Sequence, residues 1–149
     1  MIYGIILIVL GLLAAPSLLL SKKPNAKELL DKLVPYQGWA GVVFCIWGIW
    51  GIISTILSIG VFFSFGLWGM IWGITSLLCS LVEAVLGFLL GYPLIVQYAL
   101  SKNEAAKEKG AQLLAKLQPI QGKLGLLGII MGIWWIICSF LYAAAIAIA

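Results

Sequence analysis

The sequence contains no histidine and no arginine, and only 9% of its 149 residues are charged. A soluble domain of this length carries about a quarter charged residues, so this chain lacks the side chains that a water-facing surface needs. Without histidine, haem ligation by a histidine pair is excluded and a zinc site has few ligands to draw on. We therefore expect no metal and no cofactor.

Cysteine is also scarce. Cys45, Cys79 and Cys138 each lie inside an apolar run and none belongs to a C-x-x-C pair, so they are predicted to be small buried hydrophobic side chains. The apolar runs also lack combinations of His, Asp and Lys that could carry out acid–base or metal catalysis. The sequence predicts that the protein is not an enzyme.

Hydrophobic residues make up 64% of the chain and form unbroken runs, such as residues 1–20 and 39–59. Transmembrane strands would alternate between apolar and polar residues. Runs of about 20 apolar residues match a helix that crosses ~30 Å of hydrocarbon. A cleaved signal peptide explains the first run less well, because no basic residue precedes it and no polar domain follows it. The sequence predicts an all-α integral membrane protein.

One phrase occurs twice: LLDKLVPYQG begins at Leu29, and LLAKLQPIQG begins at Leu113. The match continues at the same offset into the apolar run that follows each copy. Upstream, SKKPNAKE at residues 21–28 resembles SKNEAAKE at residues 101–108, at a slightly shorter offset. Shared leucines are common among apolar helices, but a shared Pro-x-Gln-Gly is not. We interpret the chain as a tandem duplication.

Each unit is then an apolar helix, a polar connection and a second apolar helix. Ser101 and Glu104 in the second connection have the spacing of a capping box. In both connections apolar residues follow at helical spacing, until Pro35 in the first copy and Pro119 in the second are expected to end the run. These segments are predicted to be short amphipathic helices at the membrane surface.

All lysines lie in the two connections, and short lysine-rich loops stay on the cytoplasmic side of a membrane. The chain must then cross an even number of times between them, and residues 39–100 have room for two spans. We expect four transmembrane helices in a bacterial inner membrane, with both termini outside. The lysines are also candidate contacts for anionic lipid headgroups: Lys22, Lys23, Lys27, Lys32, Lys102, Lys107, Lys109, Lys116 and Lys123.

The predicted fold is two tandem helical hairpins of the same orientation, related by a pseudo-twofold axis along the membrane normal. Each hairpin has a short amphipathic cytoplasmic connecting helix. The first hairpin covers residues 1–59, with spans at 1–20 and 39–59 and a connection at 21–38. The second covers residues 76–149, with spans at 76–100 and 123–148 and a connection at 101–122.

Residues 60–75 have no counterpart in the first unit and are rich in glycine and aromatic residues. A single helix over residues 61–100 would be about 60 Å long, which is twice the hydrocarbon thickness. The sequence therefore predicts an interfacial or re-entrant segment at the outer face. A continuous helix that projects outward is the alternative.

Glu83 is the one acidic residue outside the lysine-bearing connections. A carboxylate within a membrane span is costly, so we expect it to be protonated, paired or facing a wet cavity. One hypothesis is an ion- or proton-binding site. The other is a structural role, in which Glu83 bonds to Ser80, Thr75 or a neighbouring helix.

Glycine and tryptophan recur together in the apolar runs. Small residues let helix backbones approach closely in a membrane. The candidate helix-packing residues are Gly41, Gly48, Trp50, Gly125, Gly132 and Trp134. A slot for a pigment, a quinone or a lipid is the alternative interpretation.

These features favour a non-catalytic structural or accessory subunit of a larger membrane complex. Its expected partners are membrane lipids and other membrane-protein subunits or copies of itself. Nucleic acid is not an expected partner, because acidic residues are interspersed among the lysines. The alternative is a small homo-oligomeric ion or proton channel, or a transporter, that uses Glu83.

Overall fold

The computed structural model describes residues 2–15 and 25–148, and these residues form helices and no strands. The long helices are α3 (Ala26–Leu57), α5 (Gly66–Ile95) and α7 (Gln121–Ile148). Three stretches are long and apolar enough to cross a membrane, namely Pro35–Leu57, Gly66–Leu100 and Glu104–Ala144. The prediction of an all-helical chain with long apolar helices is confirmed.

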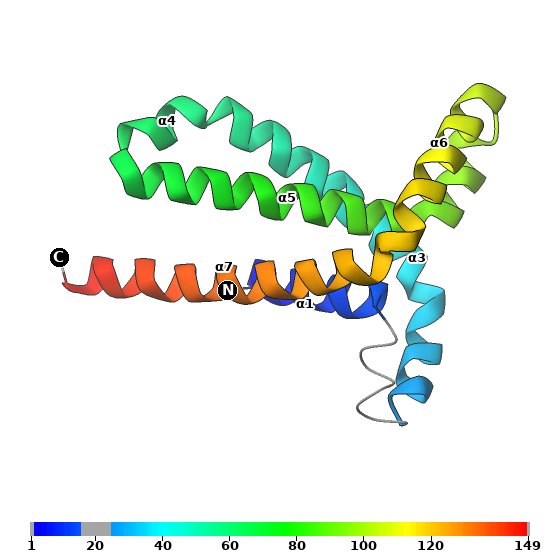
Figure 1. Cartoon of the computed structure of the whole chain (residues 1–149), viewed down its shortest axis with the longest axis horizontal. Helices are drawn as coiled ribbons and strands as arrows, with labels where there is room; N and C mark the ends of the chain where they lie inside the picture. Colours follow the sequence, from blue (N-terminus) through cyan, green and yellow to red (C-terminus); the bar gives the residue numbers. More distant parts are fainter. Residues whose placement is uncertain (1, 16–24, 149) are drawn as a thin grey trace.

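The shorter helices are α1 (Ile2–Ala14), α4 (Ile59–Ser64) and α6 (Glu104–Leu117). α1 and α5 run toward the end of the molecule where α6 lies, and α3 and α7 run away from it (Figure 1). The start of α3 lies at that same end, whereas α4 and the C-terminus lie at the opposite end (Figure 1). The parts of both lysine-bearing connections that the structure describes therefore share one end.

The first connection is not a separate helix. α3 continues from Ala26 to Leu57 with Pro35 inside it. Proline lacks a backbone N–H, and its ring crowds the carbonyl group one turn earlier. A helix that continues through a proline is therefore bent. The first turns of α3 lie at a steep angle to the rest (Figure 1). The predicted end at Pro35 is therefore wrong, because the helix continues through the proline.

The second connection does contain a helix of its own. α6 ends at Leu117, and Pro119 lies in the 3-10 turn η2 (Gln118–Ile120) that leads into α7. The capping residue differs from the expected Ser101, because the helix begins only at Glu104. The side chain of Asn103 instead accepts a hydrogen bond from the Ala106 N–H at 3.2 Å.

The aromatic segment at residues 60–75 is divided between two helices. α4 takes its first part, and the chain then turns through Gly66, whose φ of +65° favours glycine. The rest of the segment is the beginning of α5, so this helix starts at Gly66 and not at the expected residue 76. Gly73 does not break α5; it leaves room for the Phe62 ring of α4 to lie against the helix.

The helices pair differently from the two predicted hairpins. The most extensive contacts join α3 to α5 and α1 to α7, whereas α1 barely touches α3. The first helix of each unit therefore packs on the second helix of the other unit. Apolar sequence alone does not distinguish these partners, because either helix would bury a similar surface.

Glycines that are equivalent in the two units make the two major contacts. A Cβ atom on Gly41 of α3 would overlap the backbone of Gly91 on α5. A Cβ atom on Gly125 of α7 would overlap the backbone of Gly11 on α1. Gly41 and Gly125 are separated by the offset of the repeated phrase, and Gly11 and Gly91 are separated by the shorter offset of the upstream match.

The same arrangement recurs two helical turns along each helix. A Cβ atom on Gly48 would lie 2.5 Å from the Ala84 nitrogen, and one on Gly132 would lie 2.6 Å from the Gly4 oxygen. Gly48 and Gly132 are again separated by the offset of the repeated phrase, and Gly4 and Ala84 by that of the upstream match. The α3–α5 and α7–α1 contacts are therefore one contact made twice by equivalent residues.

The central core lies between α1 and α5. Leu7 and Leu10 of α1 are buried against Cys79, Leu86 and Leu90 of α5. At the α6 end, the Gln121 side chain donates a hydrogen bond to the Ala14 carbonyl oxygen at 3.1 Å. This bond connects the end of α1 to the start of α7.

Candidate functional site

Glu83 lies in the buried core, with 1% of its surface exposed. Cys79, Leu86 and Leu90 are its neighbours on the same face of α5, one or two helical turns away. These three side chains are also buried. The position of Glu83 on the helix therefore places its carboxyl group between α5 and α1.

The partner of Glu83 is Tyr3 on α1. The Tyr3 hydroxyl group donates a hydrogen bond to Glu83 Oε2 at 2.5 Å. The partners of Glu83 expected from the sequence were Ser80, Thr75 or a neighbouring helix. The observed partner comes from the neighbouring helix α1. Thr75 has a different partner, since its hydroxyl oxygen lies 3.4 Å from the Trp134 indole nitrogen that donates to it.

Aromatic side chains hold the Tyr3 ring in place. Its centroid lies 5.0 Å from that of Trp135, which in turn lies 4.9 Å from Trp72. Trp72 stacks on Tyr142 at 5.8 Å. Such tilted and stacked pairs add to the burial energy of aromatic rings. The row spans α1, α5 and α7 and fixes the direction in which the Tyr3 hydroxyl points.

The second carboxyl oxygen, Glu83 Oε1, is buried and has no hydrogen-bond partner within the described part of the chain. The salt bridge found among those residues is an exposed one, between Lys32 and Glu28 at 3.6 Å. An unsatisfied buried polar atom costs about 1–3 kcal/mol. The Glu83 carboxyl group is thus only half satisfied by the residues around it.

Tyr3 and Glu83 are separated by the same offset that relates Gly11 to Gly91. They therefore occupy equivalent positions in the two units, and they face each other where α1 and α5 meet. Sequence analysis identified Glu83 and missed Tyr3. The upstream match of residues 21–28 to 101–108 contained the signal, because the same offset aligns Tyr3 with Glu83.

An open cavity of about 150 Å³ lies beside Tyr3, and Glu83 is not among its lining residues. It has room for several water molecules, and its hydroxyl groups could bind them. Thr55 Oγ1 donates to the Gly51 carbonyl oxygen at 2.8 Å and lies 3.2 Å from Ser76 Oγ. The residues around the cavity are Tyr3, Trp47, Gly51, Ser54, Thr55, Ser76, Ser80 and Trp135.

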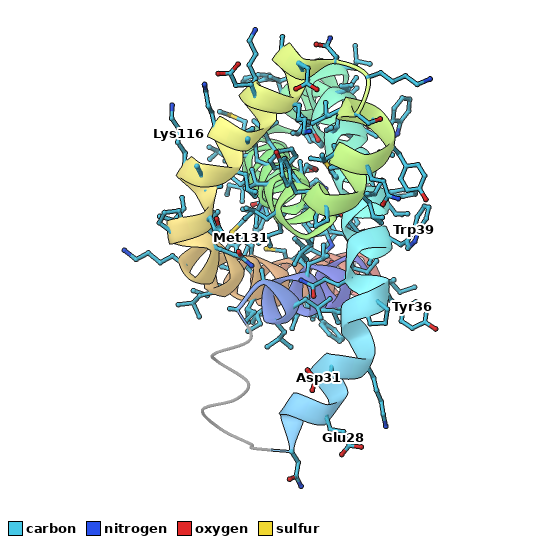
Figure 2. The ribbon with its side chains drawn as sticks, turned by 90° about the vertical axis from the view of Figure 1, so that its right-hand side faces the viewer. Glu28, Asp31, Tyr36, Trp39, Lys116 and Met131 are labelled. Atoms are coloured by element: carbon cyan, nitrogen blue, oxygen red, sulfur yellow. The ribbon has the colours of Figure 1, made fainter. Side chains whose placement is uncertain are left out.

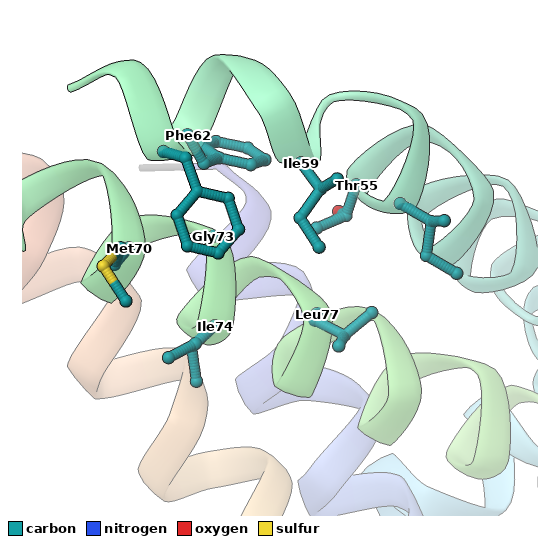
Figure 3. Close-up of a pocket in the computed structure, with 9 residues that line it drawn as sticks. Thr55, Ile59, Phe62, Met70, Gly73, Ile74 and Leu77 are labelled. Carbon is teal, nitrogen blue, oxygen red and sulfur yellow. The ribbon is translucent and has the colours of Figure 1, made fainter. Parts of the chain in front are cut away.

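A second cavity, of about 120 Å³, lies under α4 and is almost wholly apolar (Figure 3). Thr55 supplies its one side-chain hydroxyl group, and that group bonds elsewhere. The lining therefore offers too few polar partners to hold an ordered water molecule, which needs two to four of them. The other lining residues are Ile56, Ile59, Phe62, Phe63, Met70, Gly73, Ile74 and Leu77.

The lysines expected to contact lipid are exposed where the structure describes them. Lys116 on α6 points outward, and Glu28 and Asp31 lie on the first turns of α3 (Figure 2). Lys22, Lys23 and the Lys27 side chain lie outside the described residues. The exposed ones are Lys32, Lys102, Lys107, Lys109, Lys116 and Lys123. Within the described ranges, no group of three or more His, Cys, Asp or Glu could hold a metal ion.

The candidate packing residues divide into two groups. The four glycines lie at the helix contacts described above. Trp50 turns outward and is 66% exposed, whereas Trp134 is 45% exposed and donates its indole N–H to Thr75 of α5. Trp50 therefore adds little to packing within the chain, because the glycines alone bring the backbones together.

Both tryptophans belong to exposed apolar rows that advance by alternating steps of three and four residues. Residues at this spacing lie along one face of a helix. The α3 seam consists of Trp39, Val43, Ile46, Trp50, Ile53 and Leu57. The α7 seam consists of Leu127, Ile130, Trp134, Ile137 and Leu141, each at the repeat offset from its α3 counterpart.

Comparisons with known protein families, curated proteins and solved structures find no match. Function is therefore inferred from the contacts and exposed surfaces of this chain. Two features stand out: the duplicated apolar seams on the outside, and the buried Tyr3–Glu83 pair with an open, partly polar pocket beside Tyr3.

Proposed function

We propose that this chain is a multi-pass membrane protein that acts as a non-catalytic structural or accessory subunit of a larger membrane complex. The observation that carries the proposal is the pair of equivalent outward seams on α3 and α7. Exposed apolar surface of this extent belongs against lipid or against another protein. Two equivalent seams give the chain two similar faces for apolar partners.

The membrane placement is part of the proposal. Four helices cross a bacterial inner membrane, both lysine-bearing connections face the cytoplasm, and both termini lie outside. The shared position of α6 and the start of α3 at one end of the molecule supports this topology (Figure 1). Lysines at a cytoplasmic surface would also attract anionic lipid headgroups, each by on the order of 1 kcal/mol.

The tryptophans in the seams favour a protein partner over lipid alone. Lipid-facing tryptophans are enriched at the two membrane–water interfaces, where the ring is apolar and the N–H is wet. Trp50 lies well inside the apolar stretch Pro35–Leu57, and Trp134 well inside Glu104–Ala144. Large rings away from the interface suit the buried centre of a protein–protein contact, where tryptophan is enriched.

The alternative is a homo-oligomeric ion or proton channel, or a transporter, that uses Glu83. The hydroxyl-lined cavity beside Tyr3 is the observation that favours it. The position of Glu83 argues against a route between copies, because its own chain encloses the carboxyl group. A route would have to pass through each chain separately.

Photo-crosslinking in native membranes tests the subunit proposal. A photoreactive residue at Ile46 in the α3 seam, or at its counterpart Ile130 in the α7 seam, is expected to trap another membrane protein. The matched control is Leu78, which is exposed on α5 outside both seams. The same partner should also purify stoichiometrically with the unmodified chain in mild detergent.

Two results would count against the subunit function. One is that all three positions give only lipid adducts and the chain purifies alone. The other is that the purified chain conducts ions in reconstituted vesicles and that Glu83→Gln abolishes the flux, which would establish the alternative.

A further inference from the structure

We propose that Glu83 is a proton-exchange site, which water reaches through the hydroxyl-lined cavity and to which Tyr3 relays the proton. This inference goes beyond the subunit function and does not depend on it. It rests on three observations: a buried carboxyl group with one oxygen that has no partner among the described residues, an open pocket beside Tyr3 that serine and threonine residues help to line, and a hydrogen bond from the Tyr3 hydroxyl group to that carboxyl group.

The carboxyl group lacks a permanent counter-charge within the described residues. An ionised carboxylate in such a site carries a large desolvation penalty. Binding a proton removes that charge and adds an O–H donor. Binding a proton therefore neutralises the Glu83 carboxylate without the help of another charged side chain.

The cavity supplies water on the other side of Tyr3. Ser54 and Thr55 line it from α3, and Ser76 and Ser80 line it from α5. Ser54 is exposed and lies within one turn of Leu57, where α3 ends and the chain turns toward α4. In the proposed topology this end of α3 lies at the outer membrane boundary, where water is available. Hydroxyl groups thus lead from that boundary to Tyr3.

Tyr3 connects the two sides by its position. Its side chain lines the cavity, and its hydroxyl group donates to Glu83 Oε2. A hydronium ion in the cavity gives a proton to Tyr3 Oη while the original Tyr3 proton passes to Glu83 Oε2. The products are water, an unchanged tyrosine and a neutral carboxyl group. The reverse transfer returns the proton to the cavity.

Few other titratable groups face the site. Tyr3 of α1 donates to Glu83, Cys79 lies one turn before Glu83 on α5, and Cys138 is the partly buried thiol of α7. None of these is a cation, and no charged side chain of the described residues contacts Glu83. Protonation of Glu83 is thus the main charge change available to this core.

Infrared spectroscopy of the full chain in lipid nanodiscs tests the proposal. The wild-type protein should show a carbonyl band of a neutral carboxyl group over part of a pH series, and Glu83→Gln should lack that band. On transfer to D₂O the wild-type band should shift quickly. Tyr3→Phe should slow the shift by about a hundredfold, at the low end of what a positioned proton-transfer group contributes.

Two further variants complete the experiment. Ser54→Leu narrows the cavity without touching the Tyr3–Glu83 bond and should also slow exchange. Tyr98→Phe, which removes an exposed hydroxyl group outside the cavity, should leave the rate unchanged. Unfolding transitions of all variants show that they are folded.

The proposal is overturned if no pH produces a carboxyl band that Glu83→Gln removes. It is also overturned if Tyr3→Phe and Ser54→Leu exchange as fast as the wild type. If Tyr3→Phe does not fold, Ser54→Leu by itself tests whether water reaches Glu83 through the cavity. An unchanged exchange rate in Ser54→Leu then rejects the proposal.

Discussion

The Tyr3 hydroxyl group satisfies one oxygen of the Glu83 carboxyl group, while the other oxygen has no partner among the described residues. Such a pair need not stabilise the fold relative to two apolar side chains. Removing one partner of a buried polar pair exposes the full desolvation cost of the other, whereas removing both can be nearly neutral. The stability that the pair adds can therefore be separated from any proton exchange at Glu83 by comparing single and double variants.

A comparison of Tyr3→Phe with the double variant Tyr3→Phe/Glu83→Leu tests this point. We expect Tyr3→Phe to lower the free energy of unfolding by about 1–3 kcal/mol, because it leaves the carboxyl group without a donor. The double variant should recover most of that loss. Unfolding in mixed detergent micelles measures both, and a double variant less stable than Tyr3→Phe would show that the pair serves stability.

At the scale of the helices, close backbone contact at glycines determines which elements pair. The contact glycines on α3, and those on α7, are two helical turns apart. They let α3 approach α5 and α7 approach α1 more closely than any other residue would allow. The first helix of each unit is thus held by the second helix of the other.

Gly41→Ala tests this pairing against Gly122→Ala. At Gly41 the added methyl group would overlap the Gly91 backbone, whereas Gly122 has nothing within 4 Å of the same position. We expect Gly41→Ala to cost about 1–3 kcal/mol of unfolding free energy, as overpacked sites do. Gly122→Ala should cost little, because it is exposed. Equal stability of the two variants would contradict the α3–α5 contact.

Local sequence patterns predicted the helices better than their partners. The apolar runs, the lysine-bearing connections and the role of Pro119 were readable because hydrophobicity and proline act locally. The pairing of α1 with α7 could not be predicted from the sequence, because it depends on which glycine faces which backbone. Pro35 was misjudged because a helix can continue through a proline at the cost of a bend, as α3 does. Tyr3 was missed because its partner lies far away in the sequence.

At the scale of the molecule, duplication and partner exchange produce one body with two similar faces. Each half contributes one helix to each major contact, so neither hairpin is packed without the other. The seams on α3 and α7 follow from the same duplication and carry equivalent side chains. In the proposed membrane placement, this arrangement would require both halves to have the same orientation.

Cysteine accessibility in intact cells measures that orientation directly. Single cysteines at Asn25, Ala105 and Ser58 are introduced into a chain whose three native cysteines are replaced by alanine. A membrane-impermeant maleimide should label Ser58→Cys in intact cells, and should label Asn25→Cys and Ala105→Cys only after the membrane is opened. Labelling of positions 25 and 105 from opposite sides would contradict the parallel duplication, the four-span topology and the subunit function built on them.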